Sequence, residues 1–447
     1  MTAAARAYRG IAGPVRNVLA DPMLRNGHAL IFSGGVTQVI GILYWIVAVR
    51  NYPAAVLGRN SAAISVTLFL AGVAELNMMS TLVRFLPTSG NRSARLILTV
   101  YAASAAVAAV LGAGFLALIP LVEPQLGFLR SSPFLAVWFV VAVITGAIFV
   151  LQDSALTGVR AAPFVPVENA SFSIAKLAMM VPFVSLMPAA GIYVSWTAAF
   201  ALAVLPTNAY LFGRAIPRHL RRAPDTGAPP RFRDMRSYFV PDTLAGFIFM
   251  AATALLPLMI IDRLGPAAAG HYALAWMIGF ALYLVSLNMG SSLVVETAAD
   301  QSELRERCLR SITHLAKLLV PAVAVIVVAT PYLLALLGPG YARADGGALR
   351  LLALAALPAL ITNTAISVTR SRRRMSMVVG IQIAISTLMW GLSAALMGPF
   401  GITGIGAAWL TAQTATAAVL VARPRLWLPA AGRRRDHARP EPAGEAS

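Results

Sequence analysis

Two ionisable residues stand in the middle of long apolar stretches of this sequence. Glu75 lies in the second such stretch and Lys176 in the fifth. A charge inside a bilayer is energetically expensive, so residues of this kind are functional candidates by default. A lysine ammonium attracts phosphate as a point charge, and a low dielectric strengthens that attraction. We therefore expect Lys176, together with Arg84, to contact a phosphate or pyrophosphate group.

Carboxylates in the same half of the chain could carry a proton or help to bind Na⁺, and the candidates for this coupling role are Glu75 and Asp153. Mid-membrane charges occur only in the first half, which favours chemistry on that side of the molecule. The alternative is structural: Glu75 and Lys176 would pair across helices and hold one bundle together. Arg84 also stands at a helix end, where snorkelling makes a charge inexpensive. Residues expected to line a wet cytoplasmic vestibule are Glu168, Asp242, Glu296 and His28.

The elements that carry these residues are predicted to be membrane-spanning helices. Of the 447 residues, 58% are hydrophobic and only 12% are charged, and the mean hydropathy is +0.75. That balance excludes a soluble domain, whose surface would lack polar groups. Helices rather than strands are indicated, because the apolar stretches are continuous, long and rich in Ala and Leu. Twelve spans are predicted at about 27–49, 61–86, 96–121, 133–157, 163–187, 191–213, 238–261, 272–297, 311–338, 347–369, 375–397 and 402–422.

The basic residues predict the topology. If the N-terminus is cytoplasmic, inside segments hold 29 of the 36 Lys and Arg residues and outside segments hold six. The positive-inside rule then places both termini in the cytoplasm. The net charge of +19 is a topology signal and an attraction to anionic lipid heads, rather than a nucleic-acid footprint.

The chain repeats itself. Ser154–Arg160 corresponds to Thr364–Arg370 at an offset of 210, and the stretch around Gly58 corresponds to the stretch around Gly270 at an offset of 212. Six spans return a chain to its starting side, so the two six-helix copies are parallel repeats around a central cavity. The predicted division is a basic cytoplasmic segment 1–26, an N-lobe 27–213, a cytoplasmic linker 214–237, a C-lobe 238–422 and a polar, disordered tail 423–447.

Motifs for catalysis and cofactors are missing from the sequence. No GxxxxGK[ST] loop is present to cradle a nucleotide, and the five His residues are dispersed without an HExxH pair. We expect no catalytic residue, no metal and no cofactor beyond H⁺ or Na⁺. Polar uncharged residues that could bind sugars or hold helices together are Gln38, Asn77, Asn169, Asn208, Asn288, Asn363, Gln382 and Gln413.

Several turn motifs resemble a known family. The hairpin Val47–Gly58 and the later Arg-Phe-Leu-Pro at Arg84–Pro87 are similar to the start of polysaccharide exporters, members of the flippase superfamily that also includes MATE drug exporters and lipid II flippases. Matching turns in the second half are Leu264–Gly270, Leu337–Tyr341 and Gly401–Trp409. The resemblance covers about 30–420 and rests on structural turns. Twelve spans rather than the fourteen of lipid II flippases disfavour a peptidoglycan precursor.

The resemblance implies a MATE-like fold in a bacterial inner (cytoplasmic) membrane. It also implies alternating-access export of a lipid-diphosphate-linked oligosaccharide from the cytoplasmic to the outer leaflet, for lipopolysaccharide or exopolysaccharide synthesis. The expected partners are the lipid-linked glycan, membrane lipids and polysaccharide assembly proteins. One alternative is an ion-coupled multidrug or metabolite antiporter of the same fold. Another is a membrane-embedded glycosyltransferase or polymerase, which the short outside loops disfavour.

Overall fold

The computed structural model describes residues 40–75, 78–222, 236–297, 304–337 and 346–428, and these residues form helices without any strand. Ten of the described helical segments are long and apolar enough to cross a membrane. The prediction of an all-α polytopic membrane protein is confirmed. The count of ten differs from twelve for two reasons. The first predicted span is described only over its shorter helix Ile40–Asn51, and the last two spans run together as one element.

That single element is α16 (Met375–Ala422), which spans 48 residues. Its backbone leaves the helical region at Gly401, where φ is 56° and ψ is −139°. Glycine adopts such a positive φ without the steric penalty that a Cβ would bring. The two predicted spans 375–397 and 402–422 therefore meet at one sharp kink, with no intervening loop.

The first half of the chain forms one bundle, which we call the N-lobe. Its elements after Ile40–Asn51 are α3 (Ala54–Ala74), α4 (Met78–Phe85), η1 (Leu86–Thr88), η2 (Gly90–Arg92), α5 (Ser93–Val122), η3 (Pro124–Arg130), α6 (Pro133–Gly158), η4 (Ala162–Phe164), α7 (Val165–Leu186), α8 (Gly191–Tyr210), the π-helical turn η5 (Leu211–Ala215) and α9 (Ile216–Arg222).

The second half forms the other bundle, the C-lobe. Its elements are α10 (Arg236–Ala254), α11 (Leu256–Leu264), α12 (Pro266–Thr297), α13 (Leu304–Leu337), α15 (Gly346–Ser371), α16 and the short turn η7 (Pro424–Leu426). The break between α10 and α11 falls at Leu255, two residues before Pro257. Proline lacks the amide hydrogen that a continuous helix would use, so a new helix begins there.

Large apolar side chains point outward on many of these helices. Val110 is 73% exposed, Leu121 is 82% exposed and Val328 is 72% exposed. On a soluble protein such residues would be unfavourable, whereas in a bilayer they face lipid chains. The helices are therefore held together by packing of their inner faces, while their outer faces suit hydrocarbon.

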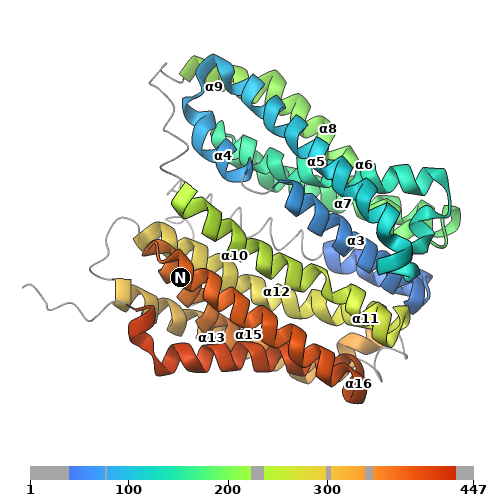
Figure 1. Cartoon of the computed structure of the whole chain (residues 1–447), viewed down its shortest axis with the longest axis vertical. Coiled ribbons are helices and arrows are strands. Elements are labelled where there is room, and N and C mark those ends of the chain that lie inside the picture. Colours follow the sequence, from blue (N-terminus) through green and yellow to red (C-terminus); the bar gives the residue numbers. More distant parts are fainter. Residues whose placement is uncertain (1–39, 76–77, 223–235, 298–303, 338–345, 429–447) are drawn as a thin grey trace, which may run out of the picture.

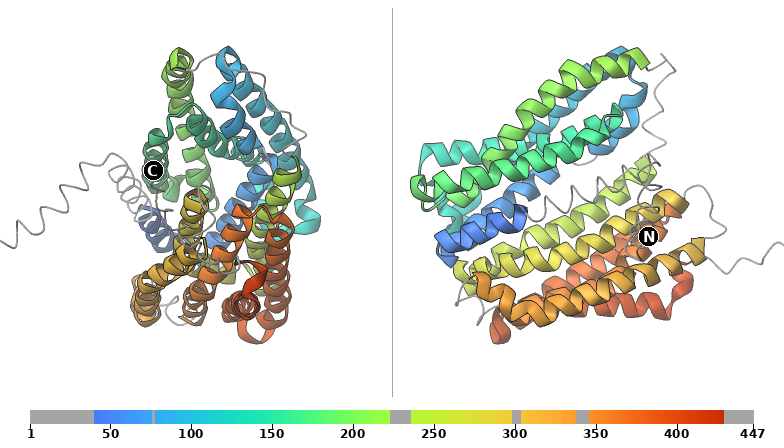
Figure 2. Two further views of the ribbon diagram at one scale, coloured as in Figure 1. Left: turned by 90° about the vertical axis from the view of Figure 1, so that its left-hand side faces the viewer. Right: turned by 180° about the vertical axis from the view of Figure 1, so that it is seen from behind.

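The two lobes meet at one end and diverge toward the other. Figures 1 and 2 show α3 of the N-lobe lying along α11 and α12, while the ends of α9 and α10 stand far apart. The most extensive contact between the lobes is that of α3 with α12. One apolar core runs across this contact and includes Ala62 and Leu70 with Ala269 and Tyr272. The end of α9 at Arg222 and the start of α10 at Arg236 lie at the divergent end.

Candidate functional site

Three carboxylates converge inside the N-lobe, and we call Glu75, Asp153 and Glu168 the carboxylate cluster. Glu75 caps the C-terminus of α3, Asp153 lies in the last two turns of α6, and Glu168 stands in the first turn of α7. The helices α6 and α7 are joined by a short turn, which brings the end of one beside the start of the other. Asp153 lies within hydrogen-bonding reach of Glu168, and it is close enough to Glu75 for their charges to interact.

Amide side chains hold the cluster in place. The Nε2 of Gln152 donates a hydrogen bond to Oε1 of Glu168, and the Nδ2 of Asn208 donates to Oε1 of Gln152 at 2.9 Å. Asn169 lies within hydrogen-bonding reach of Asp153. Gln152 is fully buried, and these bonds connect α6, α7 and α8. Buried networks of this kind fix side-chain orientation when their members are satisfied.

The cluster itself is only partly satisfied. Glu75 Oε2, Asp153 Oδ1 and Glu168 Oε2 are buried and have no hydrogen-bond partner among the described residues. No described Lys or Arg pairs with any of the three carboxylates. Buried carboxylates without a partner are strongly unfavourable, because burial removes their hydration. A bound proton or a monovalent cation would remove that penalty, so the arrangement is suited to taking up positive charge.

Metal binding by side chains alone finds less support in the described part of the chain. No group of three or more described His, Cys, Asp or Glu side chains is arranged to hold a metal ion. Asp153 and Glu168 form a close pair, with Glu75 as a third charge nearby. Two adjacent carboxylates repel each other unless a proton or a cation lies between them. The pair is therefore suited to binding one positive charge at a time.

Lys176 lies in a different part of the N-lobe, enclosed by aromatic rings. Its side chain is 6% exposed, and Nζ stands 4.0 Å from the ring centroid of Trp196, 5.1 Å from that of Phe172 and 5.6 Å from that of Tyr44. The negative faces of aromatic rings attract a desolvated cation by about 2 kcal/mol. Tyr44 is fixed in turn, because its hydroxyl donates to the carbonyl of Ile192 at 2.8 Å. We call these three rings with Lys176 the lysine cage.

The alternative structural role for Glu75 and Lys176 was an ion pair between them. The structure shows no such pair. The charge that interacts with Glu75 is Asp153, and no described carboxylate forms an ion pair with Lys176. A buried ammonium without an acidic partner adds nothing to the stability of the bundle by charge pairing. Its retention in an apolar interior favours a role in function.

The remaining predicted site residues are placed only in part. Arg84 falls in α4, Asp242 in α10 and Glu296 in α12, but their side chains lie outside the described part of the structure. His28 also lies outside the described residues. The predicted roles of these four residues stay predictions.

The sequence alone did not single out Gln152, Tyr44 or Trp196. An amide such as Gln152 inside an apolar span is a detectable signal, because it needs hydrogen-bond partners there. The cage residues carry no such signal, since aromatic residues in a membrane span are ordinarily packing residues. Tyr44 and Trp196 are also far apart in the chain and meet only after folding.

Comparison with known proteins identifies solved structures that share this fold. No protein-family model and no curated protein matches the sequence. Among solved structures, a multidrug resistance MATE family transporter of the MOP superfamily in an inward-facing conformation superposes with a TM-score of 0.68. It shares 15% identity over 89% of this chain and 98% of its own. An outward-facing structure of such a transporter gives 0.61, with 14% identity over 89% of this chain and 93% of its own.

A third solved structure is a MOP superfamily transporter from Pyrococcus furiosus, described as having a binding pocket of reverse polarity that suggests a different function. Its TM-score is 0.62, with 14% identity over 89% of this chain and 93% of its own. These matches cover nearly the full length of both chains, and they include both lobes. The chain therefore has the fold of MATE-type transporters of the MOP superfamily.

Proposed function

We propose that this protein is a secondary transporter that exports a lipid-diphosphate-linked oligosaccharide from the cytoplasmic to the outer leaflet by alternating access. The observation that carries the proposal is the carboxylate cluster, in which one buried oxygen of each carboxylate lacks a hydrogen-bond partner among the described residues. Uptake of a proton or cation there removes the penalty of burying unpaired charge, and its release restores that penalty. An ion gradient could therefore bias the N-lobe between two arrangements.

The arrangement of the lobes supports alternating access. The lobes contact each other along α3 and α12 at one end and diverge at the end of α9 and α10. The distribution of arginines assigns the divergent end to the cytoplasm. On this assignment the structure corresponds to a state closed toward the outside, and export needs the opposite state as well. Both conformations occur among the solved structures that share the fold.

The substrate class rests on the turn motifs and on Lys176. Rings cover the ammonium of Lys176 in this arrangement, so a headgroup phosphate would reach it only after Trp196 or Phe172 moves. We propose that this movement accompanies substrate binding and that Arg84 adds a second cation. No bond is made or broken, so the protein acts as a carrier.

A multidrug antiporter is the second candidate, and two observations favour it. The solved structures named above include multidrug resistance transporters. The N-lobe interior also contains a dense aromatic group, in which Phe172 stacks on Phe200 at 4.9 Å and both contact Phe149. Aromatic surfaces with a nearby carboxylate suit flat cationic drugs. The neighbour from Pyrococcus furiosus, however, is described as having a pocket whose reverse polarity suggests a different function, so the shared fold alone does not favour drug export.

The test uses the full-length protein in proteoliposomes with a fluorescent lipid-diphosphate-linked sugar and, separately, a fluorescent cationic dye. We expect an imposed pH or Na⁺ gradient to drive export of the sugar lipid but not of the dye. The double substitution of Asp153→Asn and Glu168→Gln should abolish the response to the gradient. Gln152→Leu, which leaves both carboxylates, should retain the response with an altered pH dependence.

Two results would contradict the proposal. A gradient response that survives the double substitution would remove the carboxylate cluster from the coupling mechanism. Transport of the dye with no transport of the sugar lipid would identify the antiporter function instead. Because the two readouts use the same vesicles, a failure of coupling and a wrong substrate class are distinguishable.

A further inference from the structure

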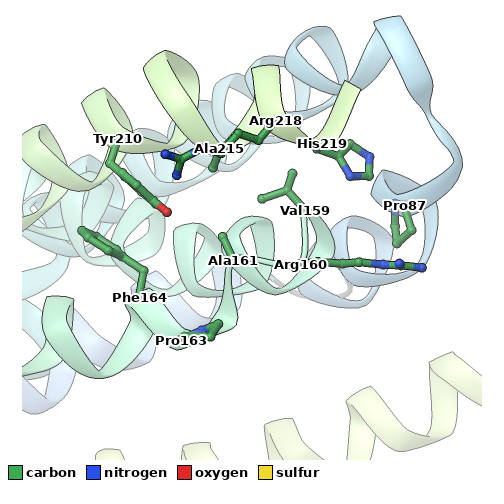
Figure 3. A pocket seen from close by; sticks show the side chains of 10 residues that line it. All are labelled: Pro87, Val159, Arg160, Ala161, Pro163, Phe164, Tyr210, Ala215, Arg218 and His219. Atoms are coloured by element: carbon green, nitrogen blue, oxygen red, sulfur yellow. The ribbon is translucent and has the colours of Figure 1, made fainter. Parts of the chain in front are cut away.

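A cavity of about 530 Å³ opens at the end of the N-lobe where α9 lies. It is enclosed by the turn between α6 and α7 on one side and by the start of α9 on the other, as Figure 3 shows. The stacked rings of Phe164 and Tyr210, with centroids 4.2 Å apart, close one end. This site lies apart from the carboxylate cluster and from the lysine cage, and none of their residues lines it.

The cavity is basic. Arg160, Arg218 and His219 line it, and its ten lining residues include no Asp or Glu. Figure 3 shows Arg218 and His219 on α9 above the cavity and Arg160 on the turn below it. Neither arginine forms a side-chain hydrogen bond or ion pair with a described residue. The cations are therefore available to a ligand.

One lining group is buried and unsatisfied. His219 is 7% exposed, and its Nε2 has no hydrogen-bond partner among the described residues. A buried imidazole nitrogen without a partner is unfavourable unless a ligand or water satisfies it. The π-helical turn η5 directly precedes α9, and such turns re-aim the residues that follow and recur at functional sites.

The backbone at the turn adds a second unusual feature. Arg160 has a φ of 60°, a left-handed conformation that a non-glycine residue adopts only when its surroundings enforce it. The turn hydrogen bonds that hold it run from the amide of Arg160 to the carbonyl of Thr157 and from the amide of Ala161 to the carbonyl of Leu156. This backbone sets the starting direction of the Arg160 side chain, which runs along the floor of the cavity in Figure 3.

The C-lobe provides an internal comparison, because Arg370 repeats Arg160 at an offset of 210 residues. There the turn after α15 is also basic and also contains a left-handed residue, Arg373 with a φ of 55°. Two of its arginines have backbone partners, however. Arg372 donates to the carbonyl of Trp427 at 3.0 Å, and Arg374 donates to the carbonyl of Leu426 at 3.2 Å.

The segment that supplies those carbonyls covers the C-lobe turn, with Trp427 and Leu428 buried against it. Among the described residues the N-lobe turn has no equivalent cover, since the sixth span continues through η5 into the helix α9. In one repeat, two arginines of the basic turn thus donate to the protein's own carbonyl oxygens, and in the other the basic turn lines a cavity. A ligand that brings anionic oxygen atoms would supply the acceptors that Arg160 and Arg218 lack among the described residues.

We propose that this cavity is a binding site for a phosphate-bearing lipid headgroup, held by Arg160, Arg218 and His219. Guanidinium groups bind phosphate through paired hydrogen bonds, and the Tyr210 hydroxyl adds a neutral donor. The position at the basic end of the N-lobe places the site at the level of lipid headgroups on the side assigned to the cytoplasm. The phosphate can belong to an anionic phospholipid or to a lipid-linked diphosphate, and the site itself does not depend on the transport proposal.

The test measures lipid binding to the purified full-length protein by native mass spectrometry. The probes are phosphatidylglycerol, a polyprenyl diphosphate, and phosphatidylcholine as the zwitterionic reference. We expect Arg218→Gln and Arg160→Asn each to weaken binding of an anionic probe by roughly tenfold, the loss typical of one charged hydrogen bond. Asparagine is chosen at position 160 because it tolerates a left-handed backbone.

The matched control is Arg221→Gln, which removes an exposed arginine of the same helix that does not line the cavity. It should bind both anionic probes as the unsubstituted protein does, and Arg218→Lys should restore part of the affinity lost in Arg218→Gln. Thermal unfolding of each variant separates loss of the site from loss of the fold.

The two sources of phosphate give different results. Loss of both anionic probes would identify a general headgroup site, and loss of the polyprenyl diphosphate alone would identify a site for the carried lipid; either supports the proposal. Unchanged binding in Arg218→Gln, Arg160→Asn and their combination would overturn it. An equal loss in Arg221→Gln would also overturn it, because the effect would then be one of net charge.

Discussion

Gly58 and Gly270 lie backbone to backbone where α3 crosses α12. A Cβ atom at Gly58 would stand 2.7 Å from the amide nitrogen of Gly270, and it would overlap the carbonyl oxygen of Pro266. A Cβ atom at Gly270 would stand 3.1 Å from the amide nitrogen of Gly58 and would overlap the carbonyl oxygen of Ala54. The two glycines are repeat-equivalent, so each half of the chain contributes the same small residue to one crossing.

Because only glycine fits this crossing without a clash, Gly58→Val or Gly270→Val should disfavour closure of the lobes there. Overpacking of this kind costs about 1–3 kcal/mol, so the population of the arrangement with closed lobes should fall roughly tenfold. Transport should fall by a similar factor. The measurement is the transport rate, combined with the access of an impermeant thiol reagent to a cysteine placed in α3. Gly114→Val is the control, because a Cβ there meets nothing within 4 Å.

Lys176→Ala should abolish transport of the sugar lipid while membrane abundance stays unchanged. Lys176→Met is the sharper variant, because it keeps an apolar chain of similar length among the rings. Removing an unpaired buried charge should leave the thermal stability unchanged or increased. Normal transport by either variant would show that the lysine cage has no part in export. A large fall in stability would show that Lys176 is structural.

Glu123 predicts a pH dependence at the end where the lobes meet. This residue follows α5 and is 3% exposed. Burial raises the pKa of its carboxyl, the charge of Asp262 at the end of α11 raises that pKa further, and a backbone hydrogen bond at Gln125 lowers it. A raised pKa means that the arrangement with Glu123 beside Asp262 binds a proton more tightly than an arrangement that exposes Glu123.

That arrangement is therefore favoured in acid, and it weakens as the pH rises from the ordinary pKa of a glutamate, about 4.3, through the raised pKa of Glu123. Distances between spin labels at the ends of α5 and α11 should lengthen over this interval. Glu123→Gln should keep them short at every pH. An opposite trend with pH, or no difference between the two proteins, would contradict the assignment.

Cys308 should be chemically inert in the folded protein. The residue is fully buried in the C-lobe core near the start of α13, and burial raises the pKa of its thiol to about 12. Only the thiolate reacts with maleimides, so little reagent should be incorporated at pH 7.5 and complete labelling should follow denaturation. Leu309→Cys in a Cys308→Ala background is the control, because position 309 is 46% exposed. Rapid labelling of native Cys308 would show that this part of α13 opens readily.

The sequence predicts the presence of the helices better than it predicts where they break. Long apolar stretches predict helices directly, since only a helix satisfies its own backbone in lipid, and the four helices α5 to α8 follow the predicted spans. The stretch 61–86 was predicted as one span, but the structure ends α3 at Ala74 and begins α4 at Met78. A break of this kind has no signature in hydropathy, because both pieces are apolar.

The candidate site could also be predicted only in part, because the sequence indicates its residues but not how they come together. Individual carboxylates at Glu75, Asp153 and Glu168 could be singled out from their apolar surroundings, since each is costly there. Their convergence depends on how three helices pack, which residue spacing along one chain does not specify. Lys176 was likewise identifiable as a buried cation, but its aromatic neighbours come from three separate helices. The sequence therefore predicts which residues are unusual, and tertiary packing decides which of them act together.

The segment 424–428 forms the cover over the C-lobe turn, and its contacts limit how far the C-terminus can be shortened. Trp427 donates from its indole nitrogen to the carbonyl of Leu420 at 3.0 Å, and its own carbonyl receives Arg372. A chain cut after the last helix, at Ala422, would lose the cover and leave two arginines without their acceptors. A chain cut after Leu428 would keep both. Affinity tags and fluorescent fusions should therefore be attached beyond Leu428, where they leave this bonding intact.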